Sequence, residues 1–525
     1  RSGSDAYTFA GFDASSKETT INGVITAAKN NSNNVKINVT VYDKSGNSYT
    51  ETKTLMIDTD KPAVTASYDN NDVRNGKYFN KDRKMTVSVT ERNFDEKDLV
   101  IAATIDGVEG TYSIEQIRNG EVDGIYLAED RMDSEKSGNV STYTNARKNT
   151  YVIGFGGNGT PVDHDYKVNV SYKDAAGNSS PVDFGSSKAA TEFTVDEIVP
   201  VLSMTYLNGN GTETLAGEDA ANPYYDTKSV KVNVNVDERN FNKKNIALAV
   251  TSKDSNGKTV DAYSQIDVEA AQTGNWKTNG NTHSYEMKDF TNDANYAVSG
   301  TYMDLAGNQA VAYAPHYFTV DKTAPTGKLY VTGSNGEKKE YSREEAKDGG
   351  ALEFIFNLFD NNSVKIENEA ADATSGLKSV KYCIVDVNAD AAAKFTIDTD
   401  FESLDWKDWT GELKVNSDKI AVVFARLEDK AGNLTYVSSD GGIIVDKKEA
   451  EAPSITVEGG SLDYYKDNFT VDVTAQDPDN GGRGIFSGMK KITYQLIDDN
   501  TGKKSKVTEL VSSDTPRERK LAGKI

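Results

Sequence analysis

The chain has 525 residues, with 81 acidic against 59 basic side chains and a formal net charge of −22. A charge of that sign argues against nucleic acid and against direct contact with an anionic membrane, because both would repel it. A single cysteine, Cys383, excludes a disulfide within the chain, which suits the cytosol and also bacterial surfaces whose exported proteins lack disulfides.

A motif ending in Gly-Asn occurs four times. Its glycines are Gly46, Gly177, Gly307 and Gly432, about 130 residues apart, and the second and third copies read Tyr-x-Asp-x-Ala-Gly-Asn. A repeat of this length is a domain, since a solenoid repeat is shorter.

A second signal keeps the same phase and marks the ends of the domains. After each Gly-Asn comes an apolar run that ends in Asp and is followed by Pro, which cannot continue a strand ladder. These pairs are Asp58 with Pro62, Asp196 with Pro200, Asp321 with Pro325, and Asp446 with Pro453. We therefore expect whole units at 61–199, 200–324 and 325–452, the back half of a unit at 1–60 and the front half of another at 453–525.

A third signal lies near the beginning of each unit, and its sequence changes between the earlier and the later units. Glu91-Arg92-Asn93-Phe94 matches Glu238-Arg239-Asn240-Phe241, whereas the later units carry Ser375-Gly376 and Ser487-Gly488 instead.

Alternating apolar and polar residues dominate each unit. Val230, Val232, Val234 and Val236 alternate with polar neighbours, as expected for a strand with one buried face. Helix signals are few, and Ser342 with Glu345 is one capping-box pattern. Many short strands between Gly, Asn and Asp turns predict an all-β chain, an elongated tandem array of β-sandwiches.

The motif Tyr-x-Asp-x-Ala-Gly-Asn followed by Phe-Thr-Val-Asp-x-x-x-Pro resembles the immunoglobulin-like domains of large Gram-positive bacterial surface proteins. The resemblance covers nearly the whole chain. It implies immunoglobulin-like sandwiches, extracellular display on the cell surface, and adhesion or spacing. Tyr166 and Tyr296 fit the family's tyrosine corner, whereas Val35 and Ala421 stand at that place in the other copies.

Nothing in the sequence predicts an enzyme. The three histidines, His164, His283 and His316, lie in different parts of their units, and no metal-binding, nucleophile or phosphate-loop motif occurs. We expect no catalytic residue and no obligatory cofactor. An accessory region of a large secreted carbohydrate-active enzyme remains a further alternative.

Acidic residues recur where one unit should meet the next. In an immunoglobulin-like sandwich the B–C and F–G loops share the pole at which the chain enters, so three acidic segments converge there. Several carboxylates in one place can bind Ca²⁺. The candidates are Asp58, Asp60, Glu91, Asp95, Asp174, Asp196, Glu197, Asp237, Glu238 and Asp304. The alternative is that these acids are ordinary turn formers.

Unit 325–452 departs from the one-sided pattern. The strand before its Gly-Asn is apolar on both faces, and a two-faced apolar strand must be covered. The cover is either the unit's own segment 385–412, through Trp406, or a ligand. The residues of that candidate ligand face are Trp406, Trp409, Ile420, Val422 and Phe424.

These observations predict a non-catalytic stalk or adhesin region that spaces or presents a binding function. We expect a monomer whose signal peptide and anchor lie outside this sequence. The alternative is that the units themselves bind a host glycan or glycoprotein, for example an immunoglobulin.

Overall fold

The structure is a computed structural model of the 525-residue chain. It describes residues 7–10, 24–27, 32–133, 146–184, 191–334, 336, 338–341, 343–345, 350–360, 364–386, 394–415, 418–439, 441–458, 464–465, 468–479, 482, 484–512 and 518–525.

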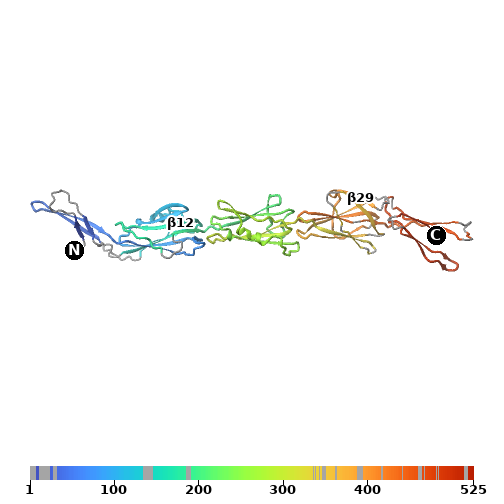
Figure 1. The fold of residues 1–525 in the computed structure, drawn as a ribbon, viewed down its shortest axis with the longest axis horizontal. Coiled ribbons are helices and arrows are strands. Elements are labelled where there is room, and N and C mark those ends of the chain that lie inside the picture. The colour runs from blue at the N-terminus through green and yellow to red at the C-terminus, as the bar shows by residue number, and fades with distance from the viewer. Residues whose placement is uncertain are drawn as a thin grey trace.

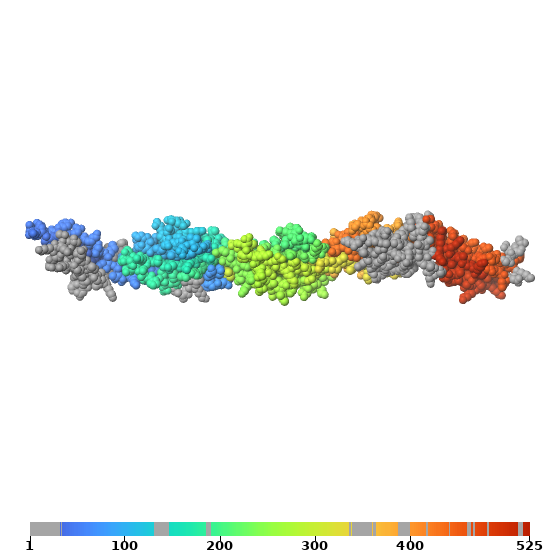
Figure 2. All heavy atoms as spheres, turned by 45° about the horizontal axis from the view of Figure 1, so that its top comes forward, coloured from blue at the N-terminus to red at the C-terminus, as the bar shows by residue number. Residues whose placement is uncertain are grey.

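The chain forms a row of β-sheet units, with its two termini at opposite ends (Figure 1). The space-filling view shows the same narrow rod, in which no unit folds back on another (Figure 2). Every strand pairing among the described residues lies inside 1–60, 61–199, 200–324, 325–452 or 453–525. Loops and linkers therefore make the contacts between the units.

Unit 61–199 is a sandwich of two sheets. The first, in spatial order, holds β5 (Ala63–Tyr68), β7 (Arg83–Glu91), β11 (Arg147–Phe155) and β10 (Ile125–Asp133). The second holds β6 (Tyr78–Phe79), β13 (Glu192–Asp196), β12 (Asp163–Tyr172), β8 (Leu99–Ile105) and β9 (Val108–Ser113). The central strand order matches the ABED and CFG sheets of an immunoglobulin-like domain.

Unit 200–324 repeats this arrangement. Its first sheet holds β15 (Glu213–Thr214), β14 (Val201–Leu207), β17 (Lys231–Asp237), β20 (Thr282–Glu286) and β19 (Lys277–Asn279). Its second sheet holds β16 (Tyr224–Asp226), β22 (Tyr313–Val320), β21 (Ala294–Thr301) and β18 (Ala247–Lys253).

Unit 325–452 has a larger second sheet. The first sheet holds β24 (Lys338–Tyr341), β23 (Thr326–Thr332), β27 (Val364–Ala371) and β31 (Leu413–Val415). The second holds, in spatial order, β25 (Arg343–Glu345), β33 (Leu434–Ser438), β32 (Lys419–Asp429), β34 (Gly441–Val445), β26 (Gly350–Asp360) and β29 (Lys394–Thr399). Two further strands branch from it: β28 (Leu377–Asp386) pairs with β32, and β30 (Lys407–Asp408) pairs with β28.

The end segments contain smaller sheets. Residues 1–60 carry β1 (Tyr7–Ala10), β2 (Val24–Ala27), β3 (Ser32–Tyr42) and β4 (Ser48–Ile57), which pair as two hairpins. Residues 453–525 carry β35 (Ser454–Glu458), β36 (Thr470–Gln476) and β41 (Lys520–Lys524) in one sheet, and the pairs β37 (Lys491–Tyr494) with β40 (Thr508–Val511) and β38 (Ile497–Asp498) with β39 (Lys503–Lys504). The described part of the chain is thus predominantly β-strand, as the alternation predicts.

Short helical turns lie between the strands. They are α1 (Ile114–Arg118), α2 (Gln265–Glu269), and the 3₁₀ turns η1 (Glu96–Asp98), η2 (Lys243–Asn245), η3 (Ala270–Gln272) and η4 (Phe401–Ser403). The segment between β8 and β11 that holds α1 and the segment between β18 and β20 that holds α2 lengthen their units beyond the usual ~100 residues. The capping-box expectation is wrong: Ser342 lies outside the described residues, and Glu345 belongs to strand β25.

The sandwich cores are rich in aromatic side chains. Tyr166 and Phe193 stack at 5.3 Å between ring centroids, and Tyr296 and Phe318 stack in the same way at 5.3 Å. Arg83 is also fully buried, in the core phase of β7, with its guanidinium 3.8 Å above the Tyr68 ring. Burial lowers the pKa of Arg83 to about 10.

The two expected tyrosine corners differ. The Tyr296 hydroxyl donates to the carbonyl of Asn292, four residues upstream, at 2.8 Å, so this corner is confirmed. The Tyr166 hydroxyl donates instead to the carbonyl of Gly124 at 2.8 Å, in a distant loop. The prediction of a local corner at Tyr166 is therefore wrong, because the carbonyl of Gly124 occupies its hydroxyl.

Candidate functional site

The Gly-Asn motif forms the same turn in all four copies. In the turn after β12, the Asp174 carboxylate accepts the backbone N–H groups of Ala176 (2.9 Å) and Asn178 (2.8 Å), and the Asn178 side chain donates to its second oxygen at 2.9 Å. Gly177 adopts φ = +93°, a backbone conformation that favours glycine. The alternative assignment of these aspartates as turn formers is therefore correct as far as it goes.

The asparagine of this turn also reaches the preceding unit. Its side-chain amide donates a second hydrogen bond to the main-chain carbonyl of the aspartate that ends the previous unit. The three bonds are Asn178 to Asp58 (3.2 Å), Asn308 to Asp196 (2.9 Å) and Asn433 to Asp321 (3.0 Å). We call these bonds the junction staples. They explain why the two sequence signals keep a common phase.

The side chain of the linker aspartate is held by the B–C loop. In the first two junctions the donor is an asparagine amide: Asn93 to Asp58 at 2.6 Å and Asn240 to Asp196 at 2.9 Å. In the later two it is the backbone N–H of a serine: Ser375 to Asp321 at 3.0 Å and Ser487 to Asp446 at 2.7 Å. The change from Glu-Arg-Asn-Phe to Ser-Gly thus replaces a side-chain donor with a main-chain donor.

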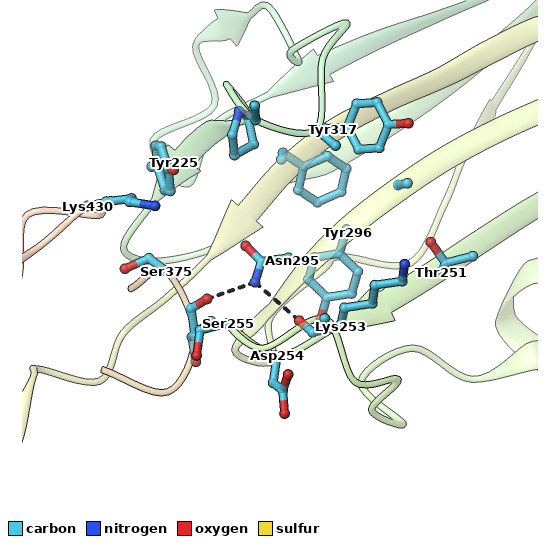
Figure 3. A pocket seen from close by; sticks show the side chains of 17 residues that line it. Tyr225, Thr251, Lys253, Asp254, Ser255, Asn295, Tyr296, Tyr317, Ser375 and Lys430 are labelled. Carbon is cyan, nitrogen blue, oxygen red and sulfur yellow. Dashed lines mark hydrogen bonds between the residues drawn. The ribbon is translucent and has the colours of Figure 1, made fainter. Parts of the chain in front are cut away.

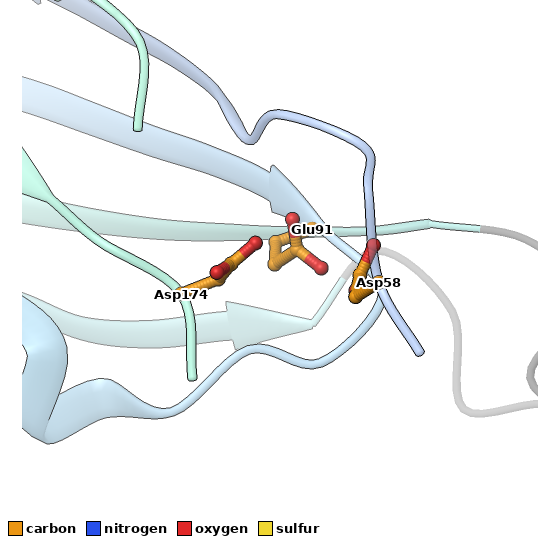
Figure 4. Close-up of side chains that lie close together, drawn as sticks. All are labelled: Asp58, Glu91 and Asp174. Carbon is orange, nitrogen blue, oxygen red and sulfur yellow. The ribbon is translucent and has the colours of Figure 1, made fainter. Parts of the chain in front are cut away.

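Carboxylates gather at three junctions. Each group has one carboxylate oxygen from every member within 4.8 Å of the others, and the groups are Asp58, Glu91 and Asp174; Asp163, Asp196 and Glu238; and Asp321, Asp372 and Asp429. Figure 4 shows the first group, in which the linker, the end of β7 and the turn after β12 bring three side chains side by side. We call these groups the junction acids.

Burial sets the electrostatics of the junction acids. Asp196 is fully buried and Glu238 is 4% exposed. Desolvation, followed by the charge of Asp163, raises the pKa of Asp196 to about 7. Desolvation also raises the pKa of Glu238 to about 7, and the charge of Asp196 adds to the increase. Arg239 pairs with Asp163 in this group, so Asp196 and Glu238 are the two carboxylates whose joint ionisation is unfavourable.

The same turn behaves differently where it stands exposed. In the first copy, Asp43 is solvent-exposed, and the hydrogen bond from the Asn47 side chain holds the pKa of Asp43 below its usual value. In the third copy, Asp304 is buried, and desolvation raises its pKa although Asn308 makes the equivalent bonds. Burial of Asp304 therefore outweighs the hydrogen bonds of its own turn.

Five of the ten predicted acids belong to junction groups: Asp58, Glu91, Asp174, Asp196 and Glu238. Asp304 lies beside the second group but its carboxylate is used by its own turn. The other four do not belong to a group: Asp60 and Asp237 are exposed, Asp95 caps η1 and pairs with Lys97, and Glu197 accepts the N–H of Asp82. Their assignment to the clusters is wrong, because each side chain points to another partner or to solvent.

The sequence reasoning missed four members. Asp321 and Asp429 stand at the linker and Gly-Asn positions of the third junction, so the same pattern could have found them. Asp163 lies at the start of β12, and Asp372 replaces Glu238 at the end of the preceding strand in a loop of different sequence.

The apolar face of β32 is covered. Ile420, Val422 and Phe424 are at most 2% exposed and pack in a second core with Phe401, and Trp406 lies against this core. They form no open ligand face, so the ligand-binding prediction for these three residues is wrong and the unit's own segment is the cover. Ile485 of the following unit packs into the same core.

The two tryptophans do not form one surface. The Trp406 indole donates to the carbonyl of Phe401 at 2.7 Å, whereas Trp409 packs against the other core and meets the Tyr382 ring at 5.8 Å between centroids. Of the side chains of β26, only that of Asp360 is described.

Each of the three histidines has a different set of neighbours in the described part of the chain, and the Thr278 hydroxyl lies 3.0 Å from Nδ1 of His283. His164 contacts Asp106 at 2.6 Å, His283 stacks on Phe241, and His316 stacks on Tyr313. No Ser or Cys side chain hydrogen-bonds to any of them in the described residues. No helix in the described part of the chain has the length and hydropathy needed to cross a bilayer.

No protein-family model matches this chain, and no curated protein sequence matches it. Among solved structures, a tetra-tandem repeat in the extending region of a large adhesion protein is 14% identical, covers 88% of this chain and 90% of its own, and has a TM-score of 0.29. The C-terminal domain of the Streptococcus pyogenes antigen I/II-family protein AspA is 10% identical, covers 50% of this chain and 99% of its own, and has a TM-score of 0.18. At these TM-scores the likenesses carry no argument about this chain.

Proposed function

We propose that this chain is an extracellular, non-catalytic stalk of an adhesin-like bacterial surface protein, which holds a binding function away from the cell. The observation that supports this proposal is the junction staple, made by the same asparagine at three successive junctions. Because the same contact recurs, each unit meets the preceding one through the same pair of loops. Figure 1 shows the units arranged in a row.

The contacts at one junction are numerous enough to limit bending. Between units 200–324 and 325–452, five hydrogen bonds of at most 3.1 Å cross directly: Asn433 to Asp321, Ser375 to Asp321, Asn295 to Thr374, and two from Ser255 to Asp372 and Ala373. A longer bond, at 3.4 Å, joins Asn433 to the carbonyl of Thr323. At about 1 kcal/mol net for each bond, the five shorter bonds contribute on the order of 5 kcal/mol. Free bending would break most of them.

Electron microscopy of single rotary-shadowed molecules tests the stalk. We expect straight rods with a narrow distribution of lengths. Molecules that are bent at random angles or collapsed into globules would contradict the proposal.

Ca²⁺ is the ligand that we propose for the junction acids. Three carboxylates with oxygens within 4.8 Å of one another are the kind of oxygen ligands that this cation prefers. Protons compete with Ca²⁺ for these sites, because two carboxylates of the second junction, Asp196 and Glu238, have raised pKa values.

Calorimetric titration of the chain with Ca²⁺, and thermal melting in Ca²⁺ or in chelator, distinguish calcium binding from proton binding at the junction acids. Calcium binding predicts heat on titration and a melting temperature that rises more at pH 8 than at pH 5, since protons compete at pH 5. A flat titration with identical melting curves at pH 8 would show that the clusters bind no Ca²⁺.

A binding role for the units themselves is a second candidate, with a host glycan or glycoprotein as the partner. A groove at the junction of units 200–324 and 325–452 favours this candidate.

A further inference from the structure

A groove opens where unit 200–324 meets unit 325–452 (Figure 3). Its volume is about 310 Å³, at the low end of the range for small-molecule sites, which suits one or two sugar rings. Lining residues are bonded across the junction: Asn295 donates to the carbonyl of Thr374 at 2.7 Å, and Ser255 donates to the carbonyl of Asp372 at 3.1 Å. The site therefore exists only where the two units are joined.

The walls combine aromatic rings with ammonium groups. Tyr225 and Tyr317 are half-buried, and their hydroxyls make no hydrogen bond to the described residues. Lys430 and Lys253 are exposed and lie on opposite sides of the groove in Figure 3. Ring faces and free donors thus line one small volume.

Neither lysine is neutralised. Within the described residues, no carboxylate oxygen lies within 4 Å of the Lys253 or Lys430 ammonium, in a chain whose net charge is −22. Asp254 is the only acid in the lining, and its carboxylate accepts the backbone N–H groups of Asn256 and Lys258, both at 2.9 Å. In Figure 3 that carboxylate points away from the groove. The lining residues alone therefore carry two positive charges and one negative charge.

The preceding unit carries a groove at the matching place with opposite character. Its volume is about 260 Å³, and its charged lining residues pair with one another. Lys77 binds Asp165 at 3.1 Å, and Lys167 binds Glu192 at 3.2 Å. Those charges are already satisfied, so this groove attracts no ion.

Strand register identifies the substitutions that make the difference. Lys167 faces Glu192 across β12 and β13, and Ala297 faces Tyr317 at the same place across β21 and β22. The register also aligns Asp165 with Asn295, and Asp106 with Lys253. The ion pair of Lys167 with Glu192 in the earlier groove is thus replaced by Ala297 and Tyr317. Asp165 and Asp106 are replaced by Asn295 and Lys253.

A third change removes an arginine. At the earlier junction Arg239, which follows Glu238, binds Asp163 through Nε at 2.6 Å and Asp165 at 3.2 Å. The residue that follows the matching acid, Asp372, is Ala373. Ala373 has a shorter side chain than Arg239, so it occupies less space beside this junction than Arg239 does beside the earlier junction.

We propose that this groove binds a carboxylate-bearing sugar. The two lysines form charge-assisted hydrogen bonds with the carboxylate. The apolar face of the sugar ring packs on Tyr225 and Tyr317, whose hydroxyls, together with the Ser255 hydroxyl, bond to the ring hydroxyls. Because the ligand contacts both units, binding also tightens the junction.

Saturation-transfer NMR and calorimetric titration of the full chain with sialyllactose, and with lactose as its neutral counterpart, test the proposal. A glucuronate-containing tetrasaccharide serves as the second acidic probe. We expect saturable binding of at least one acidic saccharide, and affinity for lactose at least tenfold lower. Removing one lysine, as Lys253→Ala or Lys430→Ala, is expected to weaken binding about tenfold, the loss for one hydrogen bond to a charged group.

Two variants test whether binding occurs in this groove. Tyr317→Glu introduces the residue that the earlier groove has at this position and should abolish saccharide binding. Lys167→Ala, in the earlier groove, should leave saccharide binding unchanged. Circular dichroism of each variant shows whether the chain remains folded. Equal binding of lactose, no binding of either acidic saccharide at 10 mM ligand by the folded chain, or equal displacement by a polyglutamate peptide would overturn the assignment.

Discussion

Glu238→Gln should stabilise the junction between units 61–199 and 200–324 at alkaline pH. Glu238 is 4% exposed, and burial raises its pKa from 4.5 to about 7. The native state therefore holds this proton more tightly than the unfolded state does between pH ~4.5 and ~7. The stabilisation is complete below ~4.5, is lost as the pH rises through ~7, and is absent above it.

The pKa shift sets the size of the effect. A pKa increase from 4.5 to about 7 corresponds to about 3 kcal/mol, an upper limit because Asp196 competes for the same proton. Glutamine retains the oxygen that accepts the N–H of Asn240 and places an amide donor near the other two carboxylates. It removes the cost of ionisation at pH 8 and changes little at pH 4.

Hydrogen exchange measures this locally, without assuming that the whole chain unfolds at once. With chelator present, amides of β17 should be protected more strongly in the variant than in the wild type at pH 8, with the difference shrinking at low pH. Asp237→Asn, on the exposed neighbour, is the control. A gain that is the same at both pH values, or no gain at pH 8, would refute the electrostatic reasoning.

Three further substitutions test individual contacts. Gly432→Ala should cost about 1–3 kcal/mol by thermal melting, because φ is +97° and the surrounding space is open, so a neutral result would contradict the strain argument. Tyr296→Phe removes the bond to Asn292 and should cost about 1 kcal/mol in denaturant unfolding; an unchanged midpoint would show that the corner contributes nothing. Trp406→Ala opens the covered face of β32 beside Phe401 and should cost about 2–4 kcal/mol and increase binding of a hydrophobic dye, whereas unchanged stability and dye binding would mean that Trp406 is not part of the cover.

The repeat phase predicted most of the fold. Alternation identified the buried faces of strands such as β17, and the linker prolines marked places where no strand pairing crosses. Alternation carries no information about a buried charge, however. Arg83 occupies a core position because three aromatic rings and the carbonyl of Asn70 surround its guanidinium, and these partners come from separate strands and loops.

The site was predicted in outline. The phase of Asp58 and Asp174 identified convergence at the junctions, but not the role of the asparagine that follows the glycine. Asn178 has two amide hydrogens, and only the three-dimensional structure shows that one bonds within its turn and the other to the previous unit. The groove beside Lys253 was not predictable either, because it depends on which strands face each other across the register.

Small-angle X-ray scattering of the chain, with and without the three staples, is the most direct test. The variant is Asn178→Ala, Asn308→Ala and Asn433→Ala together, measured in chelator so that no cation substitutes for the lost bonds. We predict a rod for the wild type and, for the folded variant, a shorter mean end-to-end distance with the scattering of a flexible chain of rigid units. Identical rods for both would contradict the claim that the junction staples hold the stalk straight.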